Sequence, residues 1–267
     1  MRRSSKQTAL EAKILKLLEG KPRQAAEWLF ASEELQAMQE YANIVSIKRL
    51  GYNDHGPVHM RKAMLNALTM FRLLADAGIS FNLEREGMAT RDDCLVAVLT
   101  ASLLHDLGMT VARENHEHMS VHFAMPFTND LLQLLYPDRL DLRVVLRSLI
   151  IEGIVGHMAT QRIHTLEAGL VLIGDGCDME KGRARIPSIL MKESRVGDIH
   201  RYSASSIEKV RIIRGDELPI RIEVEMAESA GFFQVEEVLY PKIASSPVKP
   251  YIELYAGVTG SAMLRYL

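Results

Sequence analysis

Leu103-Leu104-His105-Asp106-Leu107-Gly108 is the stretch from which the rest of this chain is best interpreted. It closes a strongly apolar segment that starts near Arg91, and the length of that segment predicts a core helix. An imidazole and a carboxylate stand here where a core would place leucine. Both groups are suitable ligands for first-row metals, and a metal would remove the cost of burying an unpaired carboxylate. The stretch therefore predicts a metal site at the end of a core helix.

Two residues far from the doublet His105-Asp106 extend it into a set of candidate ligands. His59 lies in the first turn of a helix that is predicted by apolar residues at helical spacing, among them Leu65 and Leu68. Asp175 ends a later apolar run. Together with His105 and Asp106, these side chains could hold one divalent ion and leave positions open to water and substrate, which a catalytic site requires.

Further imidazoles could hold a second ion. Asp106 is the best bridging candidate, because a carboxylate can bridge two ions and an imidazole cannot. His157 ends a helix predicted from Leu142 to Val155, and three more histidines follow the doublet: His116, His118 and His122. Seven of the nine histidines fall between His55 and His157. Such clustering is not expected of dispersed core histidines.

The order His, His-Asp, Asp, with each member at a helix end, resembles the HD-domain superfamily of metal-dependent phosphohydrolases. The resemblance covers roughly residues 50 to 190. Two-metal members show the order His, His-Asp, His, His, Asp, so the resemblance implies His59, His105, Asp106, one of the three later histidines, His157 and Asp175 as ligands. It favours His116, because Ser120 supplies the small residue that such relatives often carry four positions later. His118 and His122 share a helix face of their own and stay as alternatives.

Basic residues near the predicted ligands could bind phosphate oxygens. Arg113 lies between the doublet and His116, and three cations follow Asp175 around Gly182: Lys181, Arg183 and Arg185. A solvated basic loop that caps a helix C-terminus is the alternative interpretation. Asp178, one helical turn beyond Asp175, is expected to stand behind the ligands.

The pattern of apolar residues predicts a mainly α fold, an HD-type helical bundle with a small C-terminal α+β module. Residues 1–50 are expected to form two helices that pack on the core, Thr8 to Leu18 and about Gln24 to Ile47. Residues 51–200 would form the metal-binding helical domain. In residues 205–267, apolar and polar residues alternate as in strands on either side of a helical segment, which predicts a β-β-α-β module.

The composition excludes several classes of protein. With 48% apolar and 25% charged residues and a net charge of -2, the 267-residue chain has no general attraction to nucleic acid or to anionic membranes. No apolar run reaches the roughly 18 residues of a membrane span, and charges interrupt the segment after the basic N-terminus, so no signal peptide is expected. The two cysteines do not suggest a disulfide framework. We expect a cytoplasmic protein.

The resemblance implies hydrolysis of a phosphoester, of a nucleotide or a similar small phosphate compound, by metal-activated water. Asp106 and Asp175 would be the catalytic carboxylates, Asp106 as the bridge and Asp175 also orienting the water. The cofactors would be two divalent ions, Mn, Fe, Mg, Co or Ni. A homodimer through the C-terminal sheet edge fits the alternating strands. A di-iron oxygenase of the same superfamily and a non-catalytic ligand-sensing protein are the alternatives.

Overall fold

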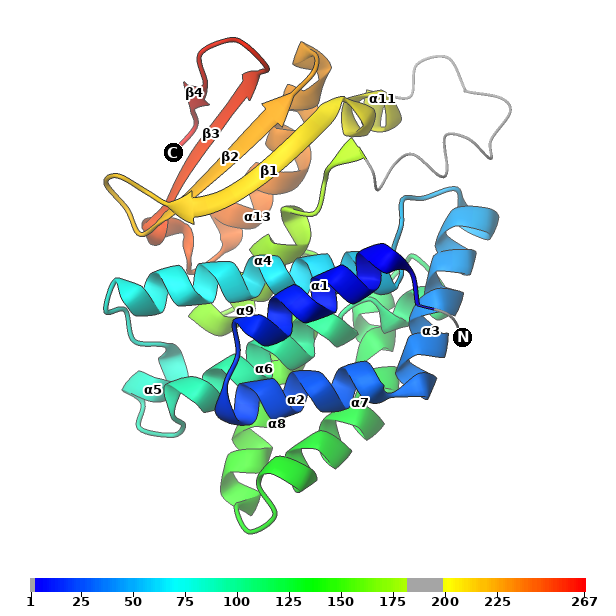
Figure 1. Cartoon of the computed structure of the whole chain (residues 1–267), viewed down its shortest axis with the longest axis vertical. Helices are drawn as coiled ribbons and strands as arrows, with labels where there is room; N and C mark the ends of the chain where they lie inside the picture. The colour runs from blue at the N-terminus through cyan, green and yellow to red at the C-terminus, as the bar shows by residue number, and fades with distance from the viewer. Residues whose placement is uncertain (1–2, 182–198) are drawn as a thin grey trace.

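The computed structural model describes residues 3–181 and 199–267 and shows a bundle of helices that carries a small sheet (Figure 1). Blue to green helices form the bundle, and the yellow to red C-terminal segment lies on one side of it. The predicted fold class, mainly α with a small C-terminal α+β module, is confirmed.

Five long helices form the centre of the bundle: α4 (Pro57–Asp76), α6 (Arg91–Leu104), α7 (His116–Leu135), α8 (Leu140–Gly156) and α9 (Leu166–Gly176). Local sequence fixes where several of them begin. Pro57 opens α4, at the position where a missing N–H costs nothing. The Thr90 hydroxyl accepts a hydrogen bond from the Asp93 N–H at the start of α6. Helix α9 is buried all round, as its continuous apolar sequence predicts.

One helical stretch among the described residues, Arg91–Thr110, is long and apolar enough to cross a membrane. It includes α6 and the 3₁₀ turn η2 (Leu107–Thr110) that follows the doublet. Protein surrounds 94% of its most apolar window. That burial is typical of a core helix.

The N-terminal region differs from its prediction, because three helices replace the expected two: α1 (Ser5–Lys16), α2 (Gly20–Ala31) and α3 (Glu33–Ile44), the last extended by a π-helical turn, η1 (Val45–Leu50). Ser32 ends the second helix and begins the third. Its side chain accepts a hydrogen bond from the Leu35 N–H, and two glutamates follow it, which together make a strong helix start. These helices pack against α4 and α6.

Beyond the short helices α5 (Asn82–Arg85) and α11 (Ile199–Ser206), the chain enters its sheet. Strands β1 (Ile207–Arg214) and β2 (Ile220–Met226) form the predicted antiparallel hairpin. Strand β3 (Ile252–Val258) pairs parallel to β2. A fourth strand, β4 (Leu264–Arg265), extends the predicted β-β-α-β order. With only two residues, it is too short to be predicted from alternation.

Several short helical segments connect β2 to β3: η3 (Ser229–Gly231), α12 (Phe232–Gln234), the π-helical turn η4 (Val235–Leu239), α13 (Tyr240–Ser245) and η5 (Lys249–Tyr251). Of these, η4 and α13 contact α9, and Figure 1 shows α13 beside the sheet. Two glycines let this connection approach α9 closely. A Cβ atom on Gly169 would lie 2.4 Å from Ser246 Oγ, and one on Gly176 would lie 3.0 Å from Lys242 Cδ. The C-terminal module is thus seated directly on the helix that carries Asp175.

Glu253 on β3 ties the sheet to the hairpin loop. Its buried carboxylate accepts hydrogen bonds from the N–H groups of Glu217 and Leu218, at 2.6 and 2.7 Å, and from Arg221 Nε at 2.9 Å. Burial opposes ionisation, but these donors lower the pKa of Glu253 to about 2. The carboxylate is therefore a charged, fully bonded part of the folded module.

We expect Glu253→Gln to lower the free energy of unfolding at pH 7 by about 2 kcal/mol, because donors to a buried charge lose their acceptor. The folded-state pKa of Glu253 lies below its ordinary value of 4.5. The wild-type advantage is therefore fully present above pH 4.5 and declines as the pH falls from there toward 2. Denaturant unfolding at pH 7 and pH 3 measures it. Glu236→Gln, the same change at an exposed position, should change little; an equal difference at both pH values would contradict the expectation.

Candidate metal centre

The ends of five helices meet at one buried point, and each contributes a histidine or an aspartate. The positions are the first turns of α4 and α7, the residues that directly follow α6 and α8, and the last turn of α9. All six predicted ligands lie there, each at most 7% exposed: His59, His105, Asp106, His116, His157 and Asp175. Helix ends separated by up to about a hundred residues are thus brought to one site.

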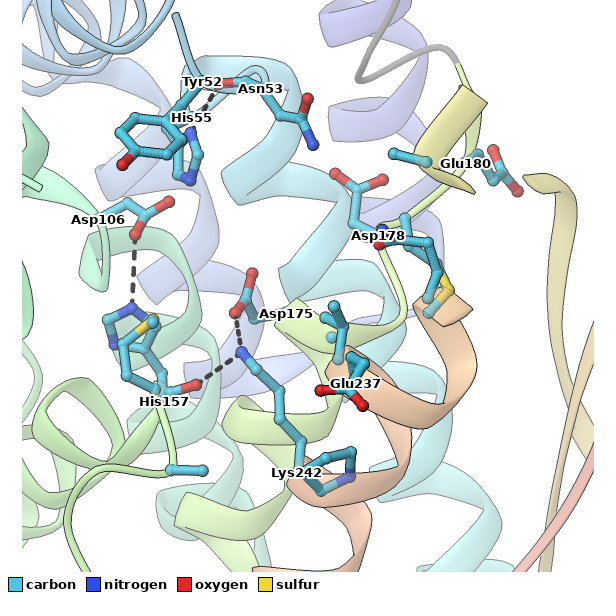
Figure 2. Close-up of a pocket in the computed structure, with 18 of the residues that line it drawn as sticks. Tyr52, Asn53, His55, Asp106, His157, Asp175, Asp178, Glu180, Glu237 and Lys242 are labelled. Carbon is cyan, nitrogen blue, oxygen red and sulfur yellow. Dashed lines mark hydrogen bonds and ion pairs between the residues drawn. The ribbon is translucent and has the colours of Figure 1, made fainter. Parts of the chain in front are cut away.

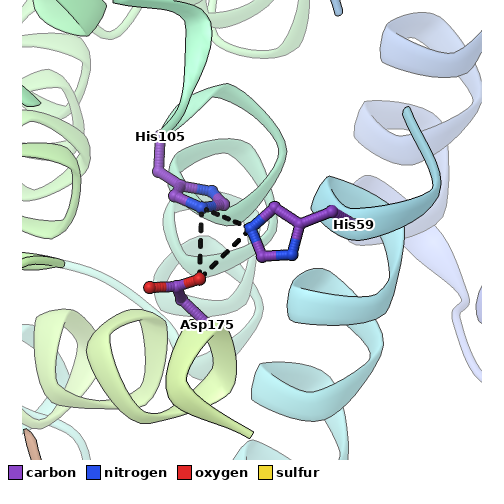
Figure 3. Close-up of side chains that lie close together, drawn as sticks. All are labelled: His59, His105 and Asp175. Atoms are coloured by element: carbon purple, nitrogen blue, oxygen red, sulfur yellow. Dashed lines mark hydrogen bonds and ion pairs between the residues drawn. The ribbon is translucent and has the colours of Figure 1, made fainter. Parts of the chain in front are cut away.

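One half of this cluster consists of His59, His105 and Asp175 (Figure 3). The Nε2 atoms of the two histidines lie 3.3 Å apart. Asp175 Oδ1 lies 3.2 Å from His59 Nε2 and 3.7 Å from His105 Nε2. Three ligand atoms this close, all directed at one point, could hold one metal ion.

The other half is built around Asp106. Its Oδ1 atom lies 3.1 Å from His116 Nε2 and 3.4 Å from His157 Nε2, and these two nitrogens are 3.0 Å apart. Its Oδ2 atom faces the first half, 3.2 Å from His59 Nε2 and 3.4 Å from His105 Nε2. A metal ion could also lie among His105, Asp106 and His157. Asp106 therefore lies between two groups of imidazoles, with one oxygen toward each.

Backbone carbonyls lie beside the Nδ1 atoms of three of these histidines, and at His116 the Nη1 atom of Arg113 also lies 3.1 Å from Nδ1. The Nδ1 atoms of His105, His116 and His157 lie 2.6–2.8 Å from the carbonyl oxygens of residues three positions earlier, Ser102, Arg113 and Ile154. An Nδ1 that donates to a carbonyl leaves the Nε2 lone pair directed at the centre, as a metal ligand requires. His59 Nδ1 lies 2.7 Å from Asp178 Oδ2. Asp178 thus stands behind His59, a candidate ligand.

The electrostatics of the cluster fit a cation. The Oδ2 atom of Asp106 is buried without a hydrogen-bond donor among the described residues. Burial opposes ionisation of Asp106, but the surrounding histidines, His105 first, hold its pKa well below the ordinary value. Burial also opposes protonation of His105, but the carboxylates of Asp106 and Asp175 raise its pKa to about 9. Burial lowers the pKa of His157 to about 4. The carboxylates therefore attract positive charge while part of the imidazole set stays neutral, as metal ligation requires.

A cavity of about 340 Å³ opens beside the cluster (Figure 2). Asp106, His157 and Asp175 line it on the side of the cluster. The C-terminal connection contributes Glu237 and Lys242 to the lining. The helical bundle and the C-terminal module thus enclose this cavity together. Sequence reasoning assigned the module no chemistry.

The remaining residues that the sequence singles out lie in different places. Arg113 lines the cavity, with its guanidinium over the Tyr52 ring. Lys181 is exposed and its ammonium lies 2.7 Å from Glu208, away from the cavity wall. Arg183 and Arg185 lie outside the described residues. His118 and His122 are exposed on α7, whereas His116 is buried in the cluster. Of the three histidines, His116 is therefore the candidate ligand.

Sequence reasoning missed two residues of the cavity wall. His55, left out of the ligand set, lies there with its Nδ1 atom 2.7 Å from Asn53 O. Lys242 reaches the cluster from α13, with Nζ 2.5 Å from Asp175 Oδ2. The sequence does hold a signal for Lys242. It recurs at helical spacing with Val235 and Leu239, which places a cation on the buried face of a helix.

Comparison with known proteins gives one relative. The chain is 35% identical over 244 residues to the uncharacterized protein MJ1020 of Methanocaldococcus jannaschii, with 91% of this chain and 92% of the archaeal protein covered. The chain belongs to the same family as this archaeal protein. Because the match leaves less than a tenth of the chain outside, it includes parts of both the bundle and the C-terminal module. No family model matches the chain, and no solved structure matches it either.

Proposed function

We propose that the protein is a metal-dependent phosphohydrolase of the HD type that cleaves a phosphoester of a small molecule. The observation that carries the proposal is the position of Asp106, whose two oxygens face two separate groups of imidazole Nε2 atoms. One shared carboxylate between two sets of nitrogen ligands suits a pair of divalent ions. Paired ions a few ångströms apart are a common arrangement in enzymes that hydrolyse phosphoesters.

The ligand types narrow the choice of ions. Imidazole and carboxylate suit Mn, Fe, Co and Ni, and Mg accepts carboxylate oxygen. Cys177 follows Asp175 closely, but burial raises the pKa of its thiol to about 12, so it stays protonated and is a poor ligand. When bound, the ions would lower the pKa of a water molecule and neutralise charge on phosphate oxygens.

The residues of this chain would divide the remaining tasks. Asp106 would hold the two ions at a fixed separation, and Asp175 would use Oδ1 as a ligand because Lys242 occupies its Oδ2 atom. Arg113, at the cavity wall, offers a guanidinium that matches the geometry of phosphate oxygens. The cavity volume is at the lower end of the range for small-molecule sites, which favours a mononucleotide or a smaller phosphate compound.

The test is hydrolysis by the purified full-length chain. We expect release of phosphate from some members of a panel of nucleotides and p-nitrophenyl phosphates when Mn, Fe, Mg, Co or Ni is added, and its loss with a chelator. The variant with both His105→Ala and Asp106→Ala should be inactive, and full activity in it would contradict the proposal. Turnover that needs iron and molecular oxygen would support the oxygenase alternative. Stabilisation by intact nucleotides without turnover would support a sensor.

A further inference from the structure

Lys242 is a buried cation that the C-terminal module inserts into the candidate metal centre. The residue is 8% exposed, and its neighbours on the same helical face, Leu239 and Ile243, belong to the core. Its aliphatic chain passes over the backbone of α9 at Gly176, where a Cβ atom would lie 3.0 Å from Lys242 Cδ, closer than an ordinary van der Waals contact. The ammonium group thus reaches the site only because the module and α9 are in close contact.

The hydrogen bonds of this ammonium leave one direction for a ligand. Lys242 Nζ donates to Asp175 Oδ2 at 2.5 Å and to the carbonyl oxygen of His157 at 2.8 Å (Figure 2). An ammonium group has three N–H donors. Because Lys242 also lines the cavity, the third donor is available to an oxygen of a molecule bound there.

We propose that Lys242 binds an anionic oxygen of the substrate, so that the C-terminal module supplies part of the substrate site. The proposal rests on the phosphohydrolase function above and names a residue for it. Charge supports it. Two divalent ions would bring four positive charges, and Lys242 and Arg113 add two more. These six charges face the five carboxylates of the cavity lining, Asp106, Asp175, Asp178, Glu180 and Glu237, so the loaded site stays positive and attracts a phosphate group.

The alternative role for Lys242 is structural, as the partner of Asp175 that docks the module. The two roles differ in what they do to phosphate binding once the metal is in place. A substrate-binding lysine contributes a charge-assisted hydrogen bond to the anion, which corresponds to about a tenfold or larger change in affinity. A docking lysine changes stability or metal uptake and leaves the affinity for phosphate unchanged.

The experiment uses the full-length protein loaded with Mn and titrated with inorganic phosphate in a calorimeter. We expect Lys242→Met to retain its Mn and to bind phosphate at least about tenfold more weakly than the wild type. Lys242→Arg, which keeps the charge, should recover part of the affinity. Lys249→Met removes an exposed lysine of the same module and should bind phosphate as the wild type does. If the Met variant does not fold, Lys242→Gln replaces it in the same comparison.

Two results would contradict the substrate-binding role of Lys242 without contradicting the proposed metal centre. One is a Met variant that holds Mn and binds phosphate within about twofold of the wild type. The other is loss of Mn, or failure to fold, in both uncharged variants, because Lys242 would then act by holding Asp175. Wild-type protein that binds no Mn at all would instead contradict the proposed function itself.

Discussion

Replacing Asp106 with asparagine is expected to remove both metal ions of the proposed centre at once. Each oxygen of its carboxylate faces a different group of histidines, so a neutral amide weakens both halves of the centre together. Substitutions behind metal ligands cost about 10- to 100-fold in metal affinity. Loss of a shared ligand should therefore exceed about 100-fold for each ion. Equilibrium dialysis followed by elemental analysis measures the metal content, and hydrolysis of the best substrate should fall with it.

Two histidine variants on α7 make matched controls. His116→Ala removes a ligand of one half and should leave one ion per chain. His118→Ala removes an exposed imidazole two positions later and should leave both ions and the activity unchanged. An Asp106→Asn protein that keeps one ion at wild-type affinity would show that the carboxylate is not shared. Loss of metal in the His118 variant would contradict the ligand set.

The members of the buried cluster could be predicted from the sequence because each is a polar residue at the end of an apolar helix. A buried carboxylate or imidazole in such a position needs a partner, and this need is visible without coordinates. The choice among three histidines was harder. It depends on where α7 begins, and His116 is its first residue. From the periodicity of the sequence alone, a helix start is known only to within a few residues, which is the separation of His116 from His118.

The contact of Lys242 with Asp175 and the break between α2 and α3 could not be predicted, for reasons of their own. The contact between Lys242 and Asp175 joins residues 67 positions apart and depends on how the module is seated on α9. Spacing along one helix carries no information about such a contact. Ser32 was missed because a single N-cap serine can interrupt a continuous apolar pattern without glycine or proline, the residues from which helix breaks are predicted.

The N-terminal helices also carry the second large expected effect, at Arg61. This arginine on α4 is 1% exposed. Its Nε atom donates to Glu11 Oε1 on α1 at 2.6 Å, and its Nη1 atom donates to Gln39 Oε1 on α3 at 2.6 Å. Removal of one partner of a buried ion pair costs about 3–5 kcal/mol, because the other charge stays buried without compensation. We expect Arg61→Met to lower the free energy of unfolding by about 3 kcal/mol in denaturant titrations, at the lower end of this range, since Gln7 and the partly exposed Arg3 still donate to Glu11.

Arg72→Met provides the matched control, because Arg72 lies on the same helix and is exposed. It should change stability by less than about 0.5 kcal/mol. The variant with both Arg61→Met and Glu11→Leu should recover much of the loss, since apolar replacement of a whole buried pair is often neutral. Equal losses in the single and the double variant would contradict this account, because the cost would then come from packing and not from the loss of the Arg61 partner of Glu11.

The same network connects the N-terminal helices to the doublet. Gln39, which accepts from Arg61, donates from Nε2 to the carbonyl oxygen of Leu103 at 2.9 Å. That carbonyl lies two residues before His105, at the end of α6. Arg61 itself follows His59 by two residues on α4. Loss of Arg61 should therefore also make the positions of the candidate ligands less well fixed. Metal affinity should fall in the Arg61→Met protein and stay unchanged in the Arg72→Met protein. Unchanged metal affinity in both variants would show that the hydrogen-bond network stabilises the fold and has no effect on metal binding.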